Sequence, residues 1–493
     1  MARLDAHDIK MTRNLQSQSC VKPPYLGTSA SEDRVLVGAS TAAIAGMLLL
    51  CITYESFGPL VVYGTTLGFG LTLTTLGSNG ARGLPRAFLL AFLSAVCAAA
   101  IGGVYAVWLD DPQQLFSDAS GFEELAAIDA GLPLGELDGF GTHEGPLPIL
   151  VWRLWYAAWG FIGIPHARYI GLALNGALIA ASGVLATLIC NLLLEPPHGA
   201  ARRVQDWLAV CGLLWLASGI HLRDSFVLFA TLGLVYCWSR VLVRPHSAFS
   251  ILLLAGGVVL FAAYADFVRR GMSVLNLSIA ACAAIGWIAN VIVGLNPRQR
   301  GLALATFAIS AVAIILVVTP VVQPRFADER RQEYDALRES TTRSSESTTA
   351  LLQSNSTAVR LVWGSAHLLV FPIPSWSYLV GSPKSAYFLF KSANILYMLL
   401  IIPPAVGFML RLPALARVRL QVALFICAVS LSLLAAIALT SIEGRHTIPS
   451  VVLLTVLGCA GMEFPRQTWR TRGSIAVSYV GIVVLAHLIW AVR

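Results

Sequence analysis

The feature of this sequence that most constrains its fold is a series of apolar stretches between Val35 and Val492. A helix needs about 20 apolar residues to cross the ~30 Å hydrocarbon core of a bilayer, and most of these stretches approach that length. Of the 493 residues, 57% are hydrophobic and 12% are charged, whereas a soluble chain carries roughly 25% charged residues. The pattern predicts an all-α, polytopic transmembrane helical bundle and excludes a soluble multi-domain protein.

The apolar stretches predict about 13 spans, each with boundaries soft by several residues. The predicted spans are 35–53, 59–77, 87–108, 169–194, 207–220, 225–243, 249–264, 273–295, 301–319, 386–408, 420–441, 447–464 and 473–491. They divide the chain into a polar N-terminal tail (1–34), an N-terminal transmembrane region (35–319), a polar segment (320–358) and a C-terminal transmembrane region (359–493).

The distribution of arginine predicts the orientation of these spans. If the tail 1–34 is cytosolic, every loop on its side is basic, as the positive-inside rule requires. These loops hold Arg82, Arg86, Arg202, Arg203, Arg240, Arg244, Arg298, Arg300, Arg411, Arg417, Arg419, Arg466, Arg470 and Arg472. We therefore expect a multi-pass protein of the inner (plasma) membrane. The net charge of +8 is scattered over these loops, so it indicates contact with membrane lipids and not with nucleic acid.

Two further apolar stretches, 147–162 and 361–374, would reverse this charge pattern if they crossed the membrane. We predict that both are juxtamembrane or re-entrant segments. In the first, Arg153 stands among Trp152, Trp155 and Trp159, which is typical of a helix lying at the membrane interface. An ordinary span with an arginine that extends to the headgroups remains the alternative.

A loop at 109–146, predicted to be extracytoplasmic, contains nine acidic residues and no lysine or arginine. Ser117 can cap a short helix that places Asp118 in its first turn. Asp118 is the candidate general base for a hydroxyl group, with Glu123 or Glu124 as a substitute or as a ligand for a divalent cation. No spacing of cysteines indicates a resident metal site. The alternative is a solvated loop that avoids positive charge for topological reasons.

Two short turns bring charged residues to the same predicted face as this loop. His221, Arg223 and Asp224 separate two apolar runs, and Arg445 and His446 separate two others. Arginine suits phosphate oxygens because its guanidinium presents a planar fork of donors, and histidine can donate a further hydrogen bond or move a proton. Both turns are therefore candidate binding sites for a phosphate or diphosphate, and the alternative is that each only finishes a helix hairpin.

The segment 323–357 breaks the charge rule on this face, because it holds Arg325, Arg330, Arg331, Arg338 and Arg343. Contact with an anionic substrate or with lipid headgroups would account for these arginines. A surface helix with Glu-to-Arg pairs accounts for them equally well.

Three stretches together resemble polyprenyl-linked membrane glycosyltransferases of the GT-C superfamily. SDASGFEELAAIDAG contains Asp118, GFGTHEGPLPILVWRLWYAAWGFIG contains Pro146, Pro148, Phe161 and Gly163, and HARYIGLALNG contains Arg168 and Asn175. EGRHTIPSVVLLTVLGCAG, which begins at Glu443, is similar to the "R-basic-x-x-P" helix of such enzymes. The resemblance covers about half of the chain.

This resemblance implies transfer of a sugar from a polyprenyl-phosphate or diphosphate donor to a glycan or lipid acceptor in cell-envelope assembly. Asp118 would be the base, and Arg168, Arg223 and Arg445 would bind the substrate. The acidic loop follows the third span here, whereas these enzymes carry it after the first. That difference keeps open a Wzy-like polysaccharide polymerase, which has a large polar loop late in the chain. A secondary transporter or lipid flippase is the alternative of another class.

Overall fold

The computed structural model describes ten ranges of the chain: 29–77, 83–108, 147–194, 199–243, 247–269, 272–292, 357–370, 386–412, 418–440 and 444–492. Within these ranges the fold is all-helical, with 15 α-helices and no strand. In chain order the elements are α2 (Ser29–Thr53), α3 (Gly58–Gly77), α4 (Leu84–Trp108), α6 (Leu147–Phe161), α7 (Arg168–Leu193), α8 (Ala200–Leu208), α9 (Gly212–Gly219), α10 (Asp224–Leu242), α11 (Ala248–Val268), α12 (Met272–Ile292), α15 (Thr357–Val370), α17 (Ala386–Arg411), α18 (Leu420–Thr440), the 3-10 helix η3 (Gly444–Thr447), α19 (Ile448–Met462) and α20 (Pro465–Val492).

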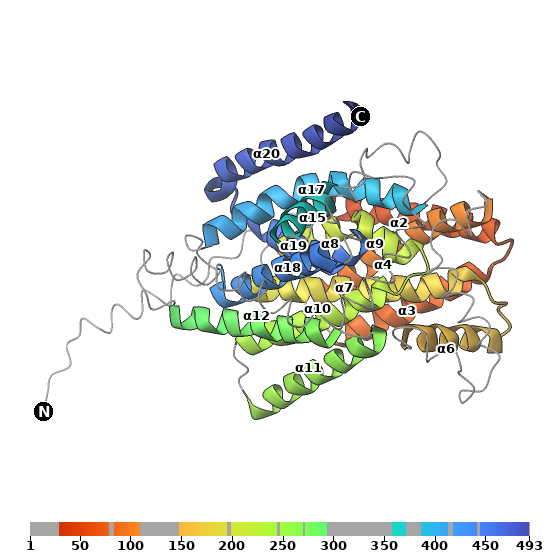
Figure 1. The fold of residues 1–493 in the computed structure, drawn as a ribbon. Coiled ribbons are helices and arrows are strands. Elements are labelled where there is room, and N and C mark those ends of the chain that lie inside the picture. Colours follow the sequence, from red (N-terminus) through yellow and green to blue (C-terminus); the bar gives the residue numbers. More distant parts are fainter. Residues whose placement is uncertain are drawn as a thin grey trace, which may run out of the picture.

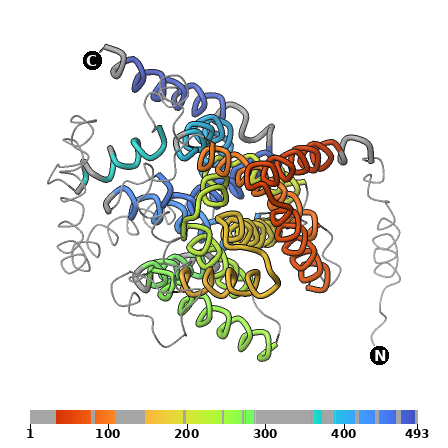
Figure 2. The backbone as a smooth tube through the Cα atoms, turned by 90° about the vertical axis from the view of Figure 1, so that its right-hand side faces the viewer, coloured from red at the N-terminus to blue at the C-terminus, as the bar shows by residue number. Residues whose placement is uncertain are grey.

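Most of the long helices run roughly side by side in Figure 1, and several are seen end on in Figure 2. Nine helices in the described part of the chain are long and apolar enough to cross a membrane. α7 lies in the middle of the bundle and packs against α4 and α10, while α11 and α20 lie on its outer sides. We call the end where α4 begins beside α8 the α8 end, and the opposite end, where α6 lies, the α6 end.

Most predicted spans agree with observed helices to within a few residues, but the apolar run 207–220 is not one continuous helix. α8 ends at Leu208 and α9 begins at Gly212. A Cβ atom on Gly212 would lie 2.7 Å from the backbone N of Asn394 in α17. The backbones of α9 and α17 therefore approach so closely that only glycine fits at this position. The span predicted at 301–319 lies outside the described residues.

The two stretches predicted to be juxtamembrane form short helices. α6 has 15 residues and α15 has 14, so they are about 22 Å and 21 Å long and fall short of the ~30 Å hydrocarbon core. The side chain of Arg153 is buried, on the face of α6 that packs into the bundle. The predicted position of α6 at the membrane interface stays a prediction.

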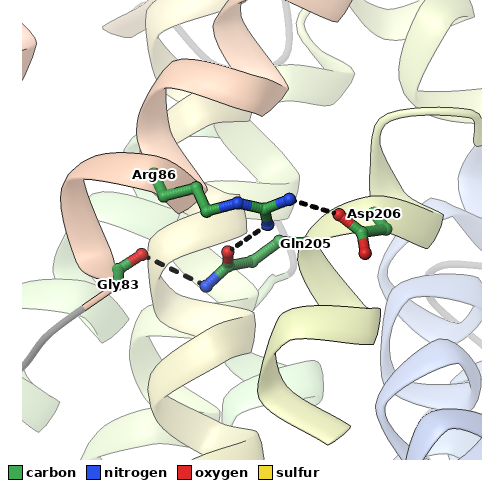
Figure 3. A network of polar contacts seen from close by, with 4 residues as sticks. All are labelled: Gly83, Arg86, Gln205 and Asp206. Atoms are coloured by element: carbon green, nitrogen blue, oxygen red, sulfur yellow. Dashed lines mark hydrogen bonds and ion pairs between the residues drawn. The ribbon is translucent and has the colours of Figure 1, made fainter. Parts of the chain in front are cut away.

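An ion pair and two hydrogen bonds join the start of α4 to α8 at the α8 end (Figure 3). Arg86 at the start of α4 donates to the side chains of Gln205 and Asp206 in α8, each at 2.8 Å. Gln205 in turn donates to the carbonyl O of Gly83 at 3.1 Å. These three hydrogen bonds join the start of α4 to α8, which is the arrangement expected of a structural contact.

Candidate functional site

The candidate carboxylates of the acidic loop, Asp118, Glu123 and Glu124, lie outside the described residues, as do the arginines between 325 and 343. The site is therefore built from the two turns at the α6 end and from the helices around them.

The turn that holds His221, Arg223 and Asp224 joins α9 to α10, and it lies beside the last turns of α4 and short of the end of that helix. A Cβ atom on Gly219, the last residue of α9, would lie 2.6 Å from the carbonyl O of Ala98, and Gly219 also touches Gly102. α4 continues for six residues beyond Gly102, which is about 9 Å along the helix. The turn is thus recessed relative to the end of α4.

Asn175 of α7 holds this turn in place. Its Nδ2 donates to the carbonyl O of Leu222 at 3.2 Å and reaches that of Ile220 at 3.5 Å, while its Oδ1 accepts from Nε1 of Trp152 at 3.2 Å. A buried backbone carbonyl needs a hydrogen-bond partner. The amide of Asn175 supplies one to Leu222 in the turn, and its oxygen links this turn to Trp152 of α6.

His221 lies in an aromatic setting formed by α6. Its ring centroid is 4.2 Å from that of Trp152, and its Nε2 is 3.2 Å from the hydroxyl of Tyr156. Burial lowers the pKa of His221 to about 3, and the nearby charges of Arg168 and His166 act in the same direction. His221 is therefore neutral near pH 7, so it can exchange hydrogen bonds but adds no positive charge for a phosphate.

Arg223 and Asp224 stand at the start of α10. Asp224 is 8% exposed and occupies the first turn of the helix, where the helix dipole favours a carboxylate. Arg223 precedes it and is only partly buried. Of the two, Arg223 is the side chain that an anion can reach.

The second turn, η3, packs against α9 and so lies beside the first. Nε2 of His446 is 3.4 Å from Nη1 of Arg269, at the end of α11. A Cβ atom on Gly444 would lie 3.1 Å from Cε of Lys391 in the first turns of α17. Nζ of Lys391 lies 4.4 Å from the ring centroid of Tyr387. We call Arg223, Arg269, Lys391, Arg445 and His446 the basic turns cluster.

The structure thus brings together the two turns that the sequence singled out, and it adds residues that sequence reasoning missed. Lys391 is a lone charge within the apolar run 386–408, which was the available signal. Tyr156 carried no signal beyond its place in an aromatic stretch. Arg168 begins α7 at the same end and lies within electrostatic range of His221.

In the parts of the chain that the structure describes, no group of three or more His, Cys, Asp or Glu side chains could hold a metal ion. The prediction of a divalent cation near Glu123 or Glu124 stays a prediction, since the acidic loop lies outside those parts.

Comparison of the chain with family models, with curated proteins and with solved structures finds no match. The apolar helices define the chain as a membrane protein with multiple transmembrane helices.

Proposed function

We propose that this protein is a membrane glycosyltransferase that takes a sugar from a polyprenyl-phosphate or diphosphate carrier, on the extracytoplasmic face of the inner membrane. The observation that carries the proposal is the basic turns cluster, gathered from α10, α11, α17 and η3 beside a recessed turn. Arginine and lysine side chains carry positive charge and several hydrogen-bond donors, which suit the oxygens of a phosphate. A phosphate group held near the membrane surface by its lipid tail matches this position and this charge.

In this reaction the protein has to take up one proton and stabilise the charge on the leaving phosphate. The hydroxyl oxygen of the acceptor attacks the anomeric carbon of the donor sugar, and the bond from that carbon to the phosphate oxygen breaks. The carboxylate of Asp118 takes the hydroxyl proton. Arg223 and Arg445 stabilise the negative charge that develops on the leaving phosphate, with His446, Arg269 and Arg168 nearby. Glu123 or Glu124 could substitute for Asp118 or hold a divalent cation.

The test is sugar transfer by the full-length protein in lipid vesicles that contain a labelled polyprenyl-linked donor. Arg223→Ala and Arg445→Ala should each lower donor use by roughly 10- to 100-fold, since a charge-assisted hydrogen bond contributes about 1.5–3 kcal/mol. Lysine should restore only part of this, because it lacks the fork of donors. Arg240→Ala is the matched control, because Arg240 is exposed at the other end of α10.

Asp118→Asn separates the enzyme hypotheses. For a general base, turnover should fall by about 10²- to 10⁴-fold while donor binding persists. Unchanged turnover in Asp118→Asn, together with loss of product when arginines between 325 and 343 are replaced by alanine, would contradict this mechanism. That pair of results would favour the Wzy-like polymerase.

One observation favours a transporter or flippase as the second candidate. Secondary transporters bind substrates at interrupted helices, and the chain is non-helical between α8 and α9 and again between α9 and α10. In the same vesicles, a flippase would move the lipid-linked sugar across the bilayer and form no glycosidic bond. Translocation without product would therefore replace the glycosyltransferase proposal.

A further inference from the structure

The buried face of α6 carries a cation that the glycosyl-transfer mechanism does not use. Ile149, Trp152, Arg153, Tyr156 and Trp159 are buried, and their spacing places them on one face of the helix. Arg153 is only 3% exposed and lies one turn before Tyr156. This face is the one that packs on His221 and on Asn175.

Several buried polar atoms around this face have no hydrogen-bond partner among the described residues. They are Nη1 of Arg153 and Nε1 of Trp159 in α6, and Nδ1 of His221, whose ring centroid lies 4.2 Å from that of Trp152. We call Arg153, Trp159 and His221 the α6 cluster. Over 90% of buried polar groups in proteins have a partner, so three orphans at one helix face indicate a missing ligand.

The charge of Arg153 defines the chemistry of that ligand. An arginine without an anion is strongly disfavoured at this burial, whereas a carboxylate or phosphate can accept two parallel hydrogen bonds from it. The surrounding donors and aromatic rings are uncharged, because His221 is neutral. Trp152, Tyr156 and Trp159 are buried as well, so the charge of Arg153 lies in an apolar setting that strengthens its attraction to an anion.

We propose that Arg153 anchors an oxyanion subsite, separate from the basic turns cluster, that receives a carboxylate or phosphate group carried on the sugar of the substrate. The inference rests on the proposed function and narrows its substrate class to acidic sugars. The basic turns cluster offers several cations for the more highly charged phosphate link to the lipid. The α6 cluster offers one guanidinium and uncharged partners, which matches a single negative charge on a sugar ring.

The test is binding of soluble sugars to the full-length protein in nanodiscs of uncharged phosphatidylcholine. The change in tryptophan fluorescence, to which the tryptophans on α6 contribute, measures the binding. Glucuronic acid and glucose 6-phosphate are the charged probes, and glucose is the neutral one. We expect at least one charged sugar to bind roughly 10-fold more tightly than glucose, which corresponds to about 1.4 kcal/mol. Arg153→Gln should abolish this preference, and Arg202→Gln at the α8 end should keep it.

Thermal unfolding without ligand distinguishes a binding role from a structural one. Replacing a buried charge that has no partner by an apolar residue of similar size is neutral or stabilising, so Arg153→Met should keep or raise the Tm. A clear loss of Tm or failure to fold would show that Arg153 has a structural partner, and the proposal would be wrong.

Two other results would contradict the oxyanion subsite and leave the proposed glycosyltransferase function unaffected. One is a preference for charged sugars that persists in Arg153→Gln. The other is that binding of farnesyl phosphate depends on Arg153 while binding of both charged sugars does not. In that case the group held by Arg153 would be the phosphate of the lipid carrier. Conversely, charged-sugar binding that depends on Arg153 in a protein without transferase activity would refute the proposed function and leave the subsite standing.

Discussion

At the scale of single residues, the buried imidazole of His221 should make stability depend on pH. In the unfolded chain its pKa is about 6.5, and in the folded protein burial lowers the pKa to about 3. As the pH falls from about 6.5 toward 3, the unfolded chain therefore takes up a proton that the folded protein does not. The free energy of unfolding should fall across this range and level off above it.

The measurement is thermal unfolding in detergent between pH 4 and pH 8. His221→Asn should show a weaker loss of Tm toward acid than the wild-type protein, because it removes this titrating group. Tyr156→Phe keeps the imidazole but loses the hydroxyl that lies 3.2 Å from its Nε2, so it should retain the wild-type pH dependence. Equal slopes in wild type and His221→Asn would mean that His221 has the same pKa in the folded protein as in the unfolded chain.

At the scale of elements, we predict that Asn175 fixes the turn between α9 and α10. Asn175→Leu is similar in volume but leaves the carbonyl group of Leu222 without its side-chain donor, while that of Ile220 still accepts from the backbone N of Leu222. It should lower the free energy of unfolding by about 1–3 kcal/mol, the cost of leaving a buried polar group unsatisfied. Sugar transfer should fall as well, since the turn carries Arg223.

Ser182→Ala is the control for Asn175→Leu. Ser182 is also buried in α7, but its hydroxyl donates to the carbonyl of Leu178 in its own helix. That carbonyl already belongs to the helix ladder, so the change should stay within about 0.5 kcal/mol. Denaturation of both variants in the same detergent compares them, and an equal effect of the two changes would contradict a special role for Asn175.

Hydropathy located the long helices because a segment that crosses hydrocarbon must be apolar along its whole length. The predicted span 59–77 differs from α3 by one residue at its start, and 225–243 differs from α10 by one residue at each boundary. Hydropathy missed the interruption between α8 and α9. Gly212, where α9 begins, lies against the backbone of Asn394 in α17, and hydropathy takes no account of contacts between segments so far apart in the chain. It gave no direction for Arg153, because the same pattern of tryptophans and arginine fits both an interfacial helix and one whose arginine is buried.

At the scale of the whole molecule, the arginine pattern indicated which turns share a face, and the contact of η3 with α9 agrees with that prediction. The order of spans suffices for such a prediction, because successive loops lie on alternate faces of the membrane. The order of spans does not give the depth of a loop or its neighbours. The recessed turn, Lys391 and the orphaned atoms around α6 were therefore found only from the packing of the helices. The membrane side on which the site lies is set by neither the packing nor the contacts.

That side can be measured with single cysteines and a membrane-impermeant thiol reagent in intact cells. We expect reaction at Ala130→Cys and Ser345→Cys, because both positions lie in segments predicted to be extracytoplasmic. Arg203→Cys and Arg417→Cys should react only after permeabilisation, since the basic loops of the α8 end favour the cytosol. The unaltered protein gives the background from the native cysteines.

Each pattern of labelling has a distinct consequence for the site. If Ala130 and Ser345 fall on opposite faces, one of the stretches 147–162 and 361–374 crosses the bilayer, and the acidic loop and the later polar segment cannot serve one site. If Arg203 reacts in intact cells while Ala130 does not, the orientation is inverted. The α6 end would then face the cytosol, and an extracytoplasmic glycosyltransferase would be excluded even if the basic turns cluster binds a phosphate. Labelling of Ala130 and Ser345 alone would place the acidic loop on the face from which Asp118 must act.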